Sequence, residues 1–200
     1  MNDPQSALEL HDRLALPRRW TYEETVACLP ESNRPAEIWD GDLIMSPTPS
    51  LEHQEIVLRF ARLLQDWTEP RCLGKVFIAP LDMVLSPHRV TQPDIGFVAT
   101  ARLDIIQRVL RGPADLVAEV VSLGGRNRDR IEKRDLYEQH GIKEYWILDP
   151  EPGTVDVLFL ESSSFQLAGR HHSGQLAHSR LLPGFQLSVD VLFGDVRGGV

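Results

Sequence analysis

One acidic residue interrupts a strongly apolar stretch of the chain. Residues 115–122 read DLVAEVVS, and Glu119 lies in the middle of them, two positions from Val117 and from Val121. Successive side chains of a strand point to opposite faces, so Glu119 shares a face with both valines. Burial of an ionised carboxylate is costly unless a partner or a metal compensates for the lost hydration. The pattern therefore leaves two interpretations of Glu119, a structural salt bridge and a metal ligand.

A second carboxylate belongs to the preceding apolar segment. Residues 93–99 read PDIGFVA, which predicts a strand with Asp94, Gly96 and Val98 on one face. Alternatively, Asp94 is a turn residue, because the QPD sequence around it also suits a turn. If the two strands are neighbours with these faces aligned, Asp94 and Glu119 converge on one point. Such a pair of carboxylates suits a hard cation such as Mg²⁺.

A helix predicted over residues 127–140 supplies a positive charge. Leu136 and Tyr137 define its packing face at the helical spacing, and Lys133 falls between them, one turn before Tyr137. Two further residues on this side are Asp129 and His140. Either the lysine extends to solvent, or its ammonium faces the carboxylates or a substrate phosphate.

Basic residues gather at the start of the same helix. Five cations fall within nine residues, namely Arg126, Arg128, Arg130, Lys133 and Arg134. One interpretation is a surface that contacts substrate phosphates, a role that we assign to Arg126, Arg128 and Arg130. The other is a solvated helix face, because three acidic residues are interleaved with the basic ones.

The histidines give weaker signals. His53 lies one turn ahead of Ile56 and Val57, on the core face of a helix that Ser50 caps. A hydrogen-bonded core residue is the simpler interpretation of His53, and a site residue is the alternative. His171, His172 and His178 have no spacing typical of metal ligands, and we expect them on a surface loop.

The elements that must position these residues alternate between helices and strands. We expect a short helix over 21–29 capped by Thr21, and a hairpin over 37–45 that turns at Asp40-Gly41. The amphipathic helix after Ser50 follows, and Gly74 lies beyond its end. The predicted strands are 75–86, 93–99, 115–122, 144–149 and 155–161. The remainder, through 165–167 and 187–193, is expected to form short strands and a final turn. Gly141 ends the helix over 127–140. This order predicts an α/β fold, a mixed sheet flanked by helices.

Composition limits the class of protein. Two hundred residues predict one domain over 1–200, with a core at about 37–193. The net charge of −8 argues against broad binding to a phosphate backbone, so a nuclease would need a local positive surface. Cys28 and Cys72 match no metal spacing and are expected to be free thiols. Neither a signal peptide nor an apolar run of roughly 20 residues is visible, so we expect a cytoplasmic protein without membrane contact.

Four segments together resemble a known family. They are EIWDGDLIMSPTPSLEHQEI, TQPDIGFV, PADLVAEVVS and DRIEKRDLYEQHGIKEYWILDP, and the likeness runs from Glu37 to about Phe193. The chain resembles the bacterial Uma-two family of the PD-(D/E)xK nuclease superfamily. The resemblance implies a restriction-endonuclease-like core of order α-β-β-β-α-β, with the N-terminal helix and hairpin as additions. It also implies that Asp94 is the superfamily's aspartate and Glu119 its second acid.

The chain departs from the superfamily pattern at one position. Val121 stands where the superfamily places a lysine, two residues after Glu119. The resemblance implies that this lysine has moved to the following helix, as Lys133. His53 and Glu37 also fall on recurrent family positions. We count them, with Asp129 and Tyr137, as possible accessory residues.

These features predict a metal-dependent nuclease. Asp94 and Glu119 would hold Mg²⁺ or Mn²⁺, and Lys133 would assist cleavage of a phosphodiester in DNA, or alternatively in RNA. No motif that reads bases is visible. Cutting two strands favours a homodimer. The alternatives are an inactive nuclease fold that binds nucleic acid or protein, and a structural protein with a buried ion-pair network.

Overall fold

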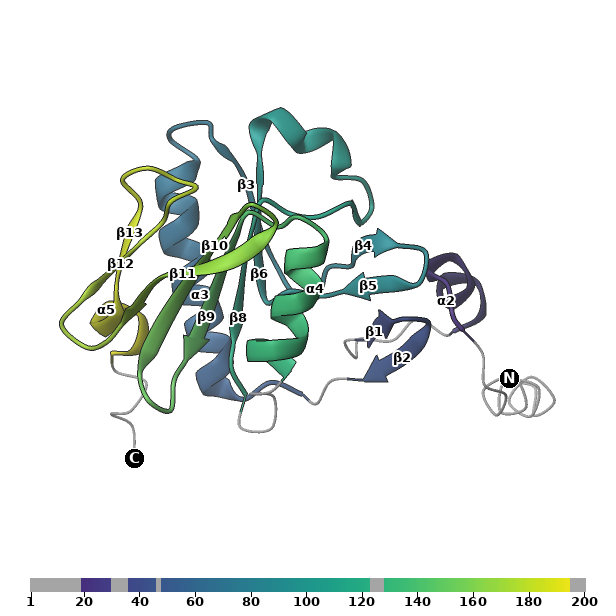
Figure 1. Ribbon diagram of the computed structural model, residues 1–200, viewed down its shortest axis with the longest axis horizontal. Coiled ribbons are helices and arrows are strands. Elements are labelled where there is room, and N and C mark those ends of the chain that lie inside the picture. The colour runs from purple at the N-terminus through teal and green to yellow at the C-terminus, as the bar shows by residue number, and fades with distance from the viewer. Residues whose placement is uncertain (1–18, 30–35, 46–47, 123–127, 195–200) are drawn as a thin grey trace.

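A six-stranded mixed sheet forms the centre of the computed structural model, which describes residues 19–29, 36–45, 48–122 and 128–194. Its strand order is β11-β10-β9-β8-β6-β3 (Figure 1). The strands are β3 (Gly74–Ile78), β6 (Ile95–Ala99), β8 (Leu116–Val120), β9 (Glu144–Asp149), β10 (Thr154–Glu161) and β11 (Ser164–His171). Neighbours are antiparallel except β8 and β9, which are parallel.

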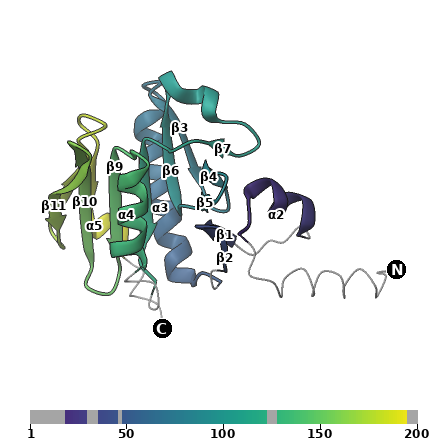
Figure 2. The ribbon, with the colours of Figure 1, turned by 45° about the vertical axis from the view of Figure 1, so that its right-hand side comes forward.

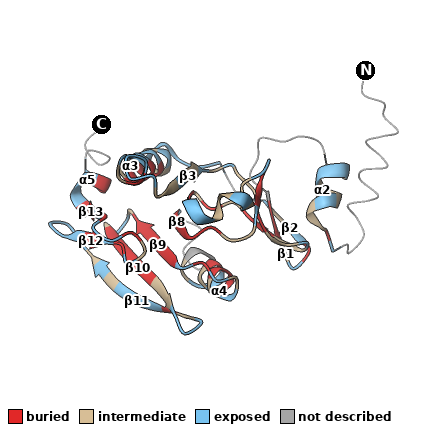
Figure 3. Cartoon of the chain, turned by 90° about the horizontal axis from the view of Figure 1, so that it is seen from above, coloured by how far each residue is buried: buried red, intermediate tan, exposed pale blue. Residues whose placement is uncertain are grey.

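Helix α3 (Leu51–Thr68) covers one face of this sheet. The Ser50 side chain accepts from the His53 N–H and begins the helix, as predicted. Its apolar face carries Phe60, whose ring packs edge-on against Trp146 of β9 with centroids 5.4 Å apart. Viewed from above, α3 and α4 lie on opposite sides of the buried central strands (Figure 3).

The helical layer on the other face of the sheet consists of two short segments. A π-helical segment, η2 (Arg128–Glu132), leads into α4 (Lys133–Gln139), where a single helix over 127–140 was predicted. Leu136 and Tyr137 pack on the sheet as expected, and Ile131 is exposed. Gly141 follows the helix with φ of +74°, a conformation that glycine adopts without the steric cost of a side chain.

A second sheet, of order β2-β1-β5-β4-β7, lies beside the first (Figure 2). It comprises β1 (Ala36–Trp39), β2 (Asp42–Met45), β4 (Met83–Ser86), β5 (Arg89–Thr91) and β7 (Leu110–Arg111). The predicted hairpin is confirmed, with positive φ at Asp40 and Gly41. Helix α2 (Tyr22–Cys28) is also confirmed, with the capping box of Thr21 and Glu24.

Three predictions of local structure are wrong. The strand over 75–86 is in fact β3 and β4, in different sheets, because Pro80 between them lacks the N–H that a continuous ladder needs. Residues Val189–Phe193 form a helix, α5, capped by Ser188. His171 and His178 lie in β11 and in β12 (Leu176–His178), which pairs with β13 (Gln186–Ser188); we expected them on a loop.

The element order α3, β3, β6, β8, α4, β9 matches the expected core α-β-β-β-α-β. The hairpin β4–β5, the 3₁₀ segment η1 (Thr100–Ile105) and β7 are insertions within it. Cys28 and Cys72 are free thiols, as predicted. Among the helices in the described ranges, none is long and apolar enough to cross a membrane.

Candidate active site

Asp94 and Glu119 approach each other on neighbouring strands. Glu119 is 1% exposed in the middle of β8, on the face that α4 covers, and Asp94 directly precedes β6. The antiparallel register pairs Ile95 with Ala118, so one further step brings Asp94 opposite Glu119. Oδ2 of Asp94 accepts a hydrogen bond from the N–H of Val120 at 2.9 Å. The carboxylate of Asp94 therefore lies at the start of β6, against the backbone of β8.

Lys133 supplies the counter-charge for Glu119. Its Nζ lies 2.8 Å from Oε2 of Glu119, and the lysine side chain is 8% exposed. Lys133 begins α4 directly after the π-helical segment, which sets the side of the helix that faces β8. Of the two interpretations of this lysine, the structure favours contact with the carboxylates over extension to solvent.

Tyr137 holds the other oxygen of Glu119. One helical turn after Lys133, its hydroxyl donates to Oε1 of Glu119 at 2.5 Å. Burial, followed by the negative charges of Glu119 and Glu37, raises the pKa of Tyr137 well above its usual value. The phenol therefore remains a proton donor at neutral pH.

Glu37 brings a third carboxylate from the second sheet. Its Oε1 accepts from the Thr91 hydroxyl at 2.5 Å and from the Gln92 N–H at 2.9 Å, and lies 3.8 Å from Nζ of Lys133. Its Oε2 is buried and has no hydrogen-bond partner among the described residues. The sequence pointed to Glu37 only through the family resemblance. No pattern in the sequence singled out Thr91, which ends the three-residue strand β5, or Gln92, which follows it. Both are ordinary polar residues.

His53 reaches the site from the first turn of α3. Its Nε2 lies 3.1 Å from Oδ2 of Asp94, and the two side chains are 14% and 18% exposed. His53 is thus a largely buried, hydrogen-bonded histidine, as the simpler interpretation expected, and its partner is a candidate metal ligand, which keeps the alternative of a site residue open. Although burial alone raises the pKa of Asp94, the His53 hydrogen bond, the charges of His53 and Lys133 and the Val120 N–H outweigh it and lower that pKa. Asp94 is thus an anion at neutral pH.

The donor set suits a hard divalent cation. The carboxylates of Glu119 and Glu37 lie 2.8 and 3.8 Å from the ammonium of Lys133, and Asp94 lies opposite Glu119 on the paired strand. One buried oxygen of Glu37 has no hydrogen-bond partner among the described residues. Mg²⁺ commonly binds one or two protein carboxylates and keeps several waters. In the part of the chain that the structure describes, no three His, Cys, Asp or Glu side chains are gathered as a complete ligand set. Water would therefore have to complete the coordination.

Of the three arginines expected at substrate phosphates, Arg130 is the one whose side chain the structure describes. Arg126 lies outside the described residues, as do the side chains of Arg128 and Asp129. Arg130 binds two buried carboxylates, those of Asp149 at 3.0 Å and Asp156 at 2.7 Å. These ion pairs compete with the expected contact to phosphate.

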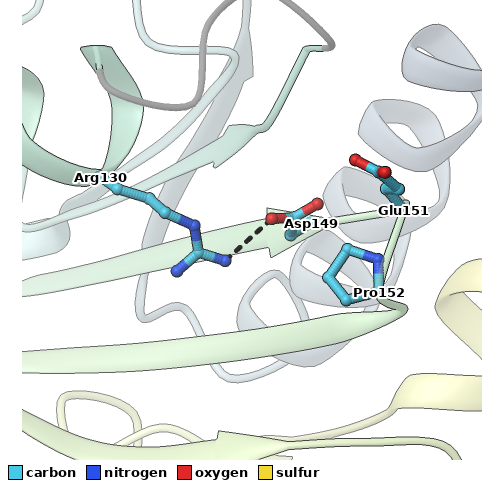
Figure 4. Close-up of a pocket in the computed structure, with 4 residues that line it drawn as sticks. All are labelled: Arg130, Asp149, Glu151 and Pro152. Carbon is cyan, nitrogen blue, oxygen red and sulfur yellow. Dashed lines mark hydrogen bonds and ion pairs between the residues drawn. The ribbon is translucent and has the colours of Figure 1, made fainter.

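Arg130 also lines a hollow of about 400 Å³, together with Asp149, Glu151 and Pro152 (Figure 4). This hollow does not include the three carboxylates of the candidate site. We place the chemistry at those carboxylates, because two of them are buried beside one lysine ammonium, whereas the hollow is lined by an arginine already paired with two acids.

Comparisons with known proteins agree with this fold. The profile of the Uma2 (Uma-two) family, described as "Putative restriction endonuclease", matches residues 23–190. The structure is similar to a crystal structure titled as a putative nuclease of family DUF820 from Anabaena variabilis ATCC 29413. The TM-score is 0.74 with 21% identity, over 86% of this chain and 97% of that chain. Among curated proteins, none matches significantly. With the profile spanning most of its length and its fold restriction-endonuclease-like, the chain belongs to the Uma2 family.

Proposed function

We propose that the chain is a divalent-metal-dependent endonuclease that hydrolyses phosphodiester bonds in DNA. One observation carries the proposal. A carboxylate in the middle of the central strand β8 faces a buried lysine ammonium at 2.8 Å, and a second carboxylate lies at the start of the adjacent strand. Burying so many charges is costly for stability alone, and such groups cluster at functional sites. Membership of the Uma2 family gives independent support.

Each side chain has a distinct task in this proposal. Asp94 and Glu119 would hold Mg²⁺ or Mn²⁺, which supplies Lewis-acid stabilisation of the negative charge that develops on the scissile phosphate. Lys133 adds a compact positive charge to the same region. Tyr137, protonated throughout, fixes one oxygen of Glu119. His53 fixes one oxygen of Asp94, and these two side chains are more exposed than those of Glu119 and Lys133.

Cleavage of plasmid DNA tests the proposal. The purified protein should nick or linearise the plasmid with Mg²⁺ or Mn²⁺, and EDTA should stop the reaction. Asp94→Asn removes one charge with little change of volume and should abolish cleavage. Asp66→Asn, at an exposed ion pair on α3, is the matched control and should cleave normally. Equal rates for wild type and Asp94→Asn would mean that a contaminant cleaves, and the proposal would fail.

Single-stranded RNA is the second substrate to compare in the same assay. The described residues present no aromatic stripe or other device that separates DNA from RNA by recognising bases, so the ratio of the two rates decides the substrate class. Faster cleavage of RNA than of DNA would contradict DNA as the substrate. It would not contradict the dependence of cleavage on a divalent metal.

One observation favours a different function. Both oxygens of Glu119 already accept hydrogen bonds, from Tyr137 and from Lys133, so this carboxylate is part of a hydrogen-bonded network without any metal. An inactive nuclease fold that binds nucleic acid or protein is consistent with that network. Nucleic-acid binding without cleavage, with Mg²⁺ binding absent by calorimetry, would support this alternative.

A further inference from the structure

We propose that Glu37 is the carboxylate to which the Lys133 ammonium transfers when a divalent cation binds Glu119. Glu37 is then a positioning residue, which acts on the cation through Lys133. This inference rests on the proposed function, because it assumes that Glu119 is a ligand of the cation. It adds a residue from the second sheet to the site and assigns it a task.

The ammonium now occupies the place that a cation would need. Nζ of Lys133 lies 2.8 Å from Oε2 of Glu119, whereas Oε1 accepts from the Tyr137 hydroxyl. A phenol hydroxyl is a neutral donor, so Tyr137 does not compete with a cation for the charge of Glu119. The ammonium does compete, because two positive charges on one buried oxygen repel each other strongly. A cation on Oε2 therefore requires Lys133 to withdraw.

Glu37 offers a second carboxylate to Lys133. Its Oε1 is already 3.8 Å from Nζ of Lys133, so a small rotation of the flexible lysine stem closes the pair. Its Oε2 is buried and lacks a hydrogen-bond partner among the described residues. A buried carboxylate oxygen left without a donor costs free energy, and the ammonium has three donors to offer.

Glu37 is also held in place while the lysine moves. The Thr91 hydroxyl and the Gln92 N–H both donate to Oε1, which anchors the carboxylate to the end of β5. Lys133 thus has two fixed acceptors in different sheets, Glu119 on β8 and Glu37 on β1. Retained by Glu37, the ammonium stays inside the site instead of leaving for solvent, ready to act on developing negative charge.

The experiment measures binding of Mg²⁺ alone to the full chain by calorimetry, without nucleic acid. Lys133→Met removes the competing charge and should bind Mg²⁺ roughly tenfold more tightly, although it loses cleavage. Glu37→Gln keeps both hydrogen bonds to Oε1 but removes the alternative partner of Lys133. It should weaken Mg²⁺ binding by about 10- to 100-fold. In the double variant, the loss caused by Glu37→Gln should shrink by about tenfold or more, because no ammonium remains to be moved.

Several results would overturn the inference. Equal losses from Glu37→Gln in both backgrounds would make Glu37 a direct ligand. Unchanged or weaker binding by Lys133→Met would show that the ammonium does not compete. Lys133→Gln, which keeps a hydrogen-bond donor for Glu119, replaces Lys133→Met if thermal unfolding shows that the latter is not folded.

Asp94→Asn separates this inference from the proposed function. If wild type does not bind Mg²⁺, or if Asp94→Asn binds it equally well, the proposed function fails and the inference fails with it. If Asp94→Asn loses binding while the Glu37 and Lys133 variants match wild type, only the inference fails.

Discussion

At the residue scale, one of the two shortest contacts of the candidate site is the hydrogen bond from Tyr137 to Glu119. The hydroxyl is buried, lies 2.5 Å from Oε1 and is also 3.4 Å from the Thr91 hydroxyl. Because the surroundings hold the phenol protonated, it serves as a permanent donor to a charged acceptor. Glu119 consequently keeps one orientation whatever its other oxygen binds.

Tyr137→Phe tests this contact. The Tyr137 ring packs edge-on against Tyr145 with centroids 5.1 Å apart, and the phenylalanine ring would keep that packing, so the change removes only the donor. We expect the free energy of unfolding to fall by about 1–3 kcal/mol, since Oε1 of Glu119 is left buried without its donor. Urea denaturation at pH 7 measures the loss. If Tyr137→Phe is as stable as wild type, the Glu119 oxygen is not buried away from water as the structure shows.

The displaced lysine gives a second prediction at this scale. Lys133→Met keeps the apolar stem and removes the ammonium, so cleavage should be lost while the fold persists. Val121 lies two positions after Glu119 on the face that α4 covers, and a long side chain there extends toward the same space. Adding Val121→Lys to Lys133→Met should restore part of the cleavage rate, because a positive charge returns to the site.

Incomplete recovery is expected from this double variant, since placement errors of about 1 Å are costly in catalysis. Val121 is also buried among apolar residues, so the new lysine must be stabilised by Glu119. The plasmid assay gives both rates. Normal cleavage by Lys133→Met would reduce Lys133 to a packing residue. If Lys133→Met does not cleave and adding Val121→Lys restores nothing, the role of Lys133 stands. The idea that the two lysines reach the same space is then contradicted.

At the scale of elements, local patterns in the sequence sufficed for the long or strongly capped segments. The apolar stripe and Ser50 predicted α3, and the capping box and the Asp40-Gly41 turn predicted α2 and the first hairpin. Short elements carried no comparable signal. Residues of β5 and β7 are stabilised by pairing with partners distant in the chain, which periodicity within two or three residues does not reveal.

The same limit applies to the candidate site. Asp94, Glu119 and Lys133 broke apolar patterns and could be found one at a time. The contact between Glu37 and Lys133 joins β1 of one sheet to a helix on another, and no spacing in the sequence encodes it. His53 looked like a core residue because its helix face is apolar; its place near the helix start, beside Asp94, depends on the packing of α3 on the sheet.

An ion-pair network joins η2 to the strands β9 and β10. Asp156 of β10 is buried and accepts from Arg170 at 2.6 and 2.8 Å and from Arg130 at 2.7 Å. Burial alone would raise the pKa of Asp156, but the hydrogen bonds and charges of Arg170 and Arg130 outweigh it and lower that pKa. The network tethers η2, the segment that leads into Lys133. Protonation of Asp156 should therefore lower the stability of η2 and α4.

The pH dependence follows from the direction of this shift. A lowered pKa in the folded state means that the Asp156 anion stabilises the protein above the unfolded value of about 3.9, and that this contribution is lost as pH falls through the lower folded value. Asp156→Asn should reduce stability by about 1–3 kcal/mol at pH 7 and flatten the decline below about pH 5. Urea unfolding between pH 3 and pH 7 checks both.

Asp66→Asn is the control for that series. Asp66 and Arg62 form an exposed pair 3.8 Å apart on α3, and such pairs contribute little. The control should follow the wild-type pH profile. If Asp156→Asn declines as steeply with falling pH as wild type does, the network is not the source of the acid sensitivity.

At the scale of the whole molecule, the long edge strand β11 is the surface most suited to a second copy of the chain. β11 is the outermost strand of the central sheet, where β10 is its one strand neighbour among the described residues (Figure 2). Near its start, Glu138 and Arg134 of α4 hydrogen-bond to the backbone of Phe165, so the free part of the edge lies beyond that residue. It is eight residues long, and Leu167 near its middle is 56% exposed. Exposed edges of this kind pair readily with another strand, and a two-fold axis there would extend the sheet into a partner.

We therefore expect a homodimer in solution, paired through β11. Two sites related by a two-fold axis would let one small chain cut both strands of a duplex. Light scattering at micromolar concentration should give twice the mass of the chain. Leu167→Lys should shift the mass toward the monomer, because a charge on the edge opposes pairing. Leu58→Lys, at a leucine 64% exposed on α3 and away from that edge, should leave the dimer intact. A monomeric wild type, with or without DNA, would contradict the dimer. An equal effect of both lysines would reject β11 as the interface, because the loss of association would then follow from added charge anywhere on the surface.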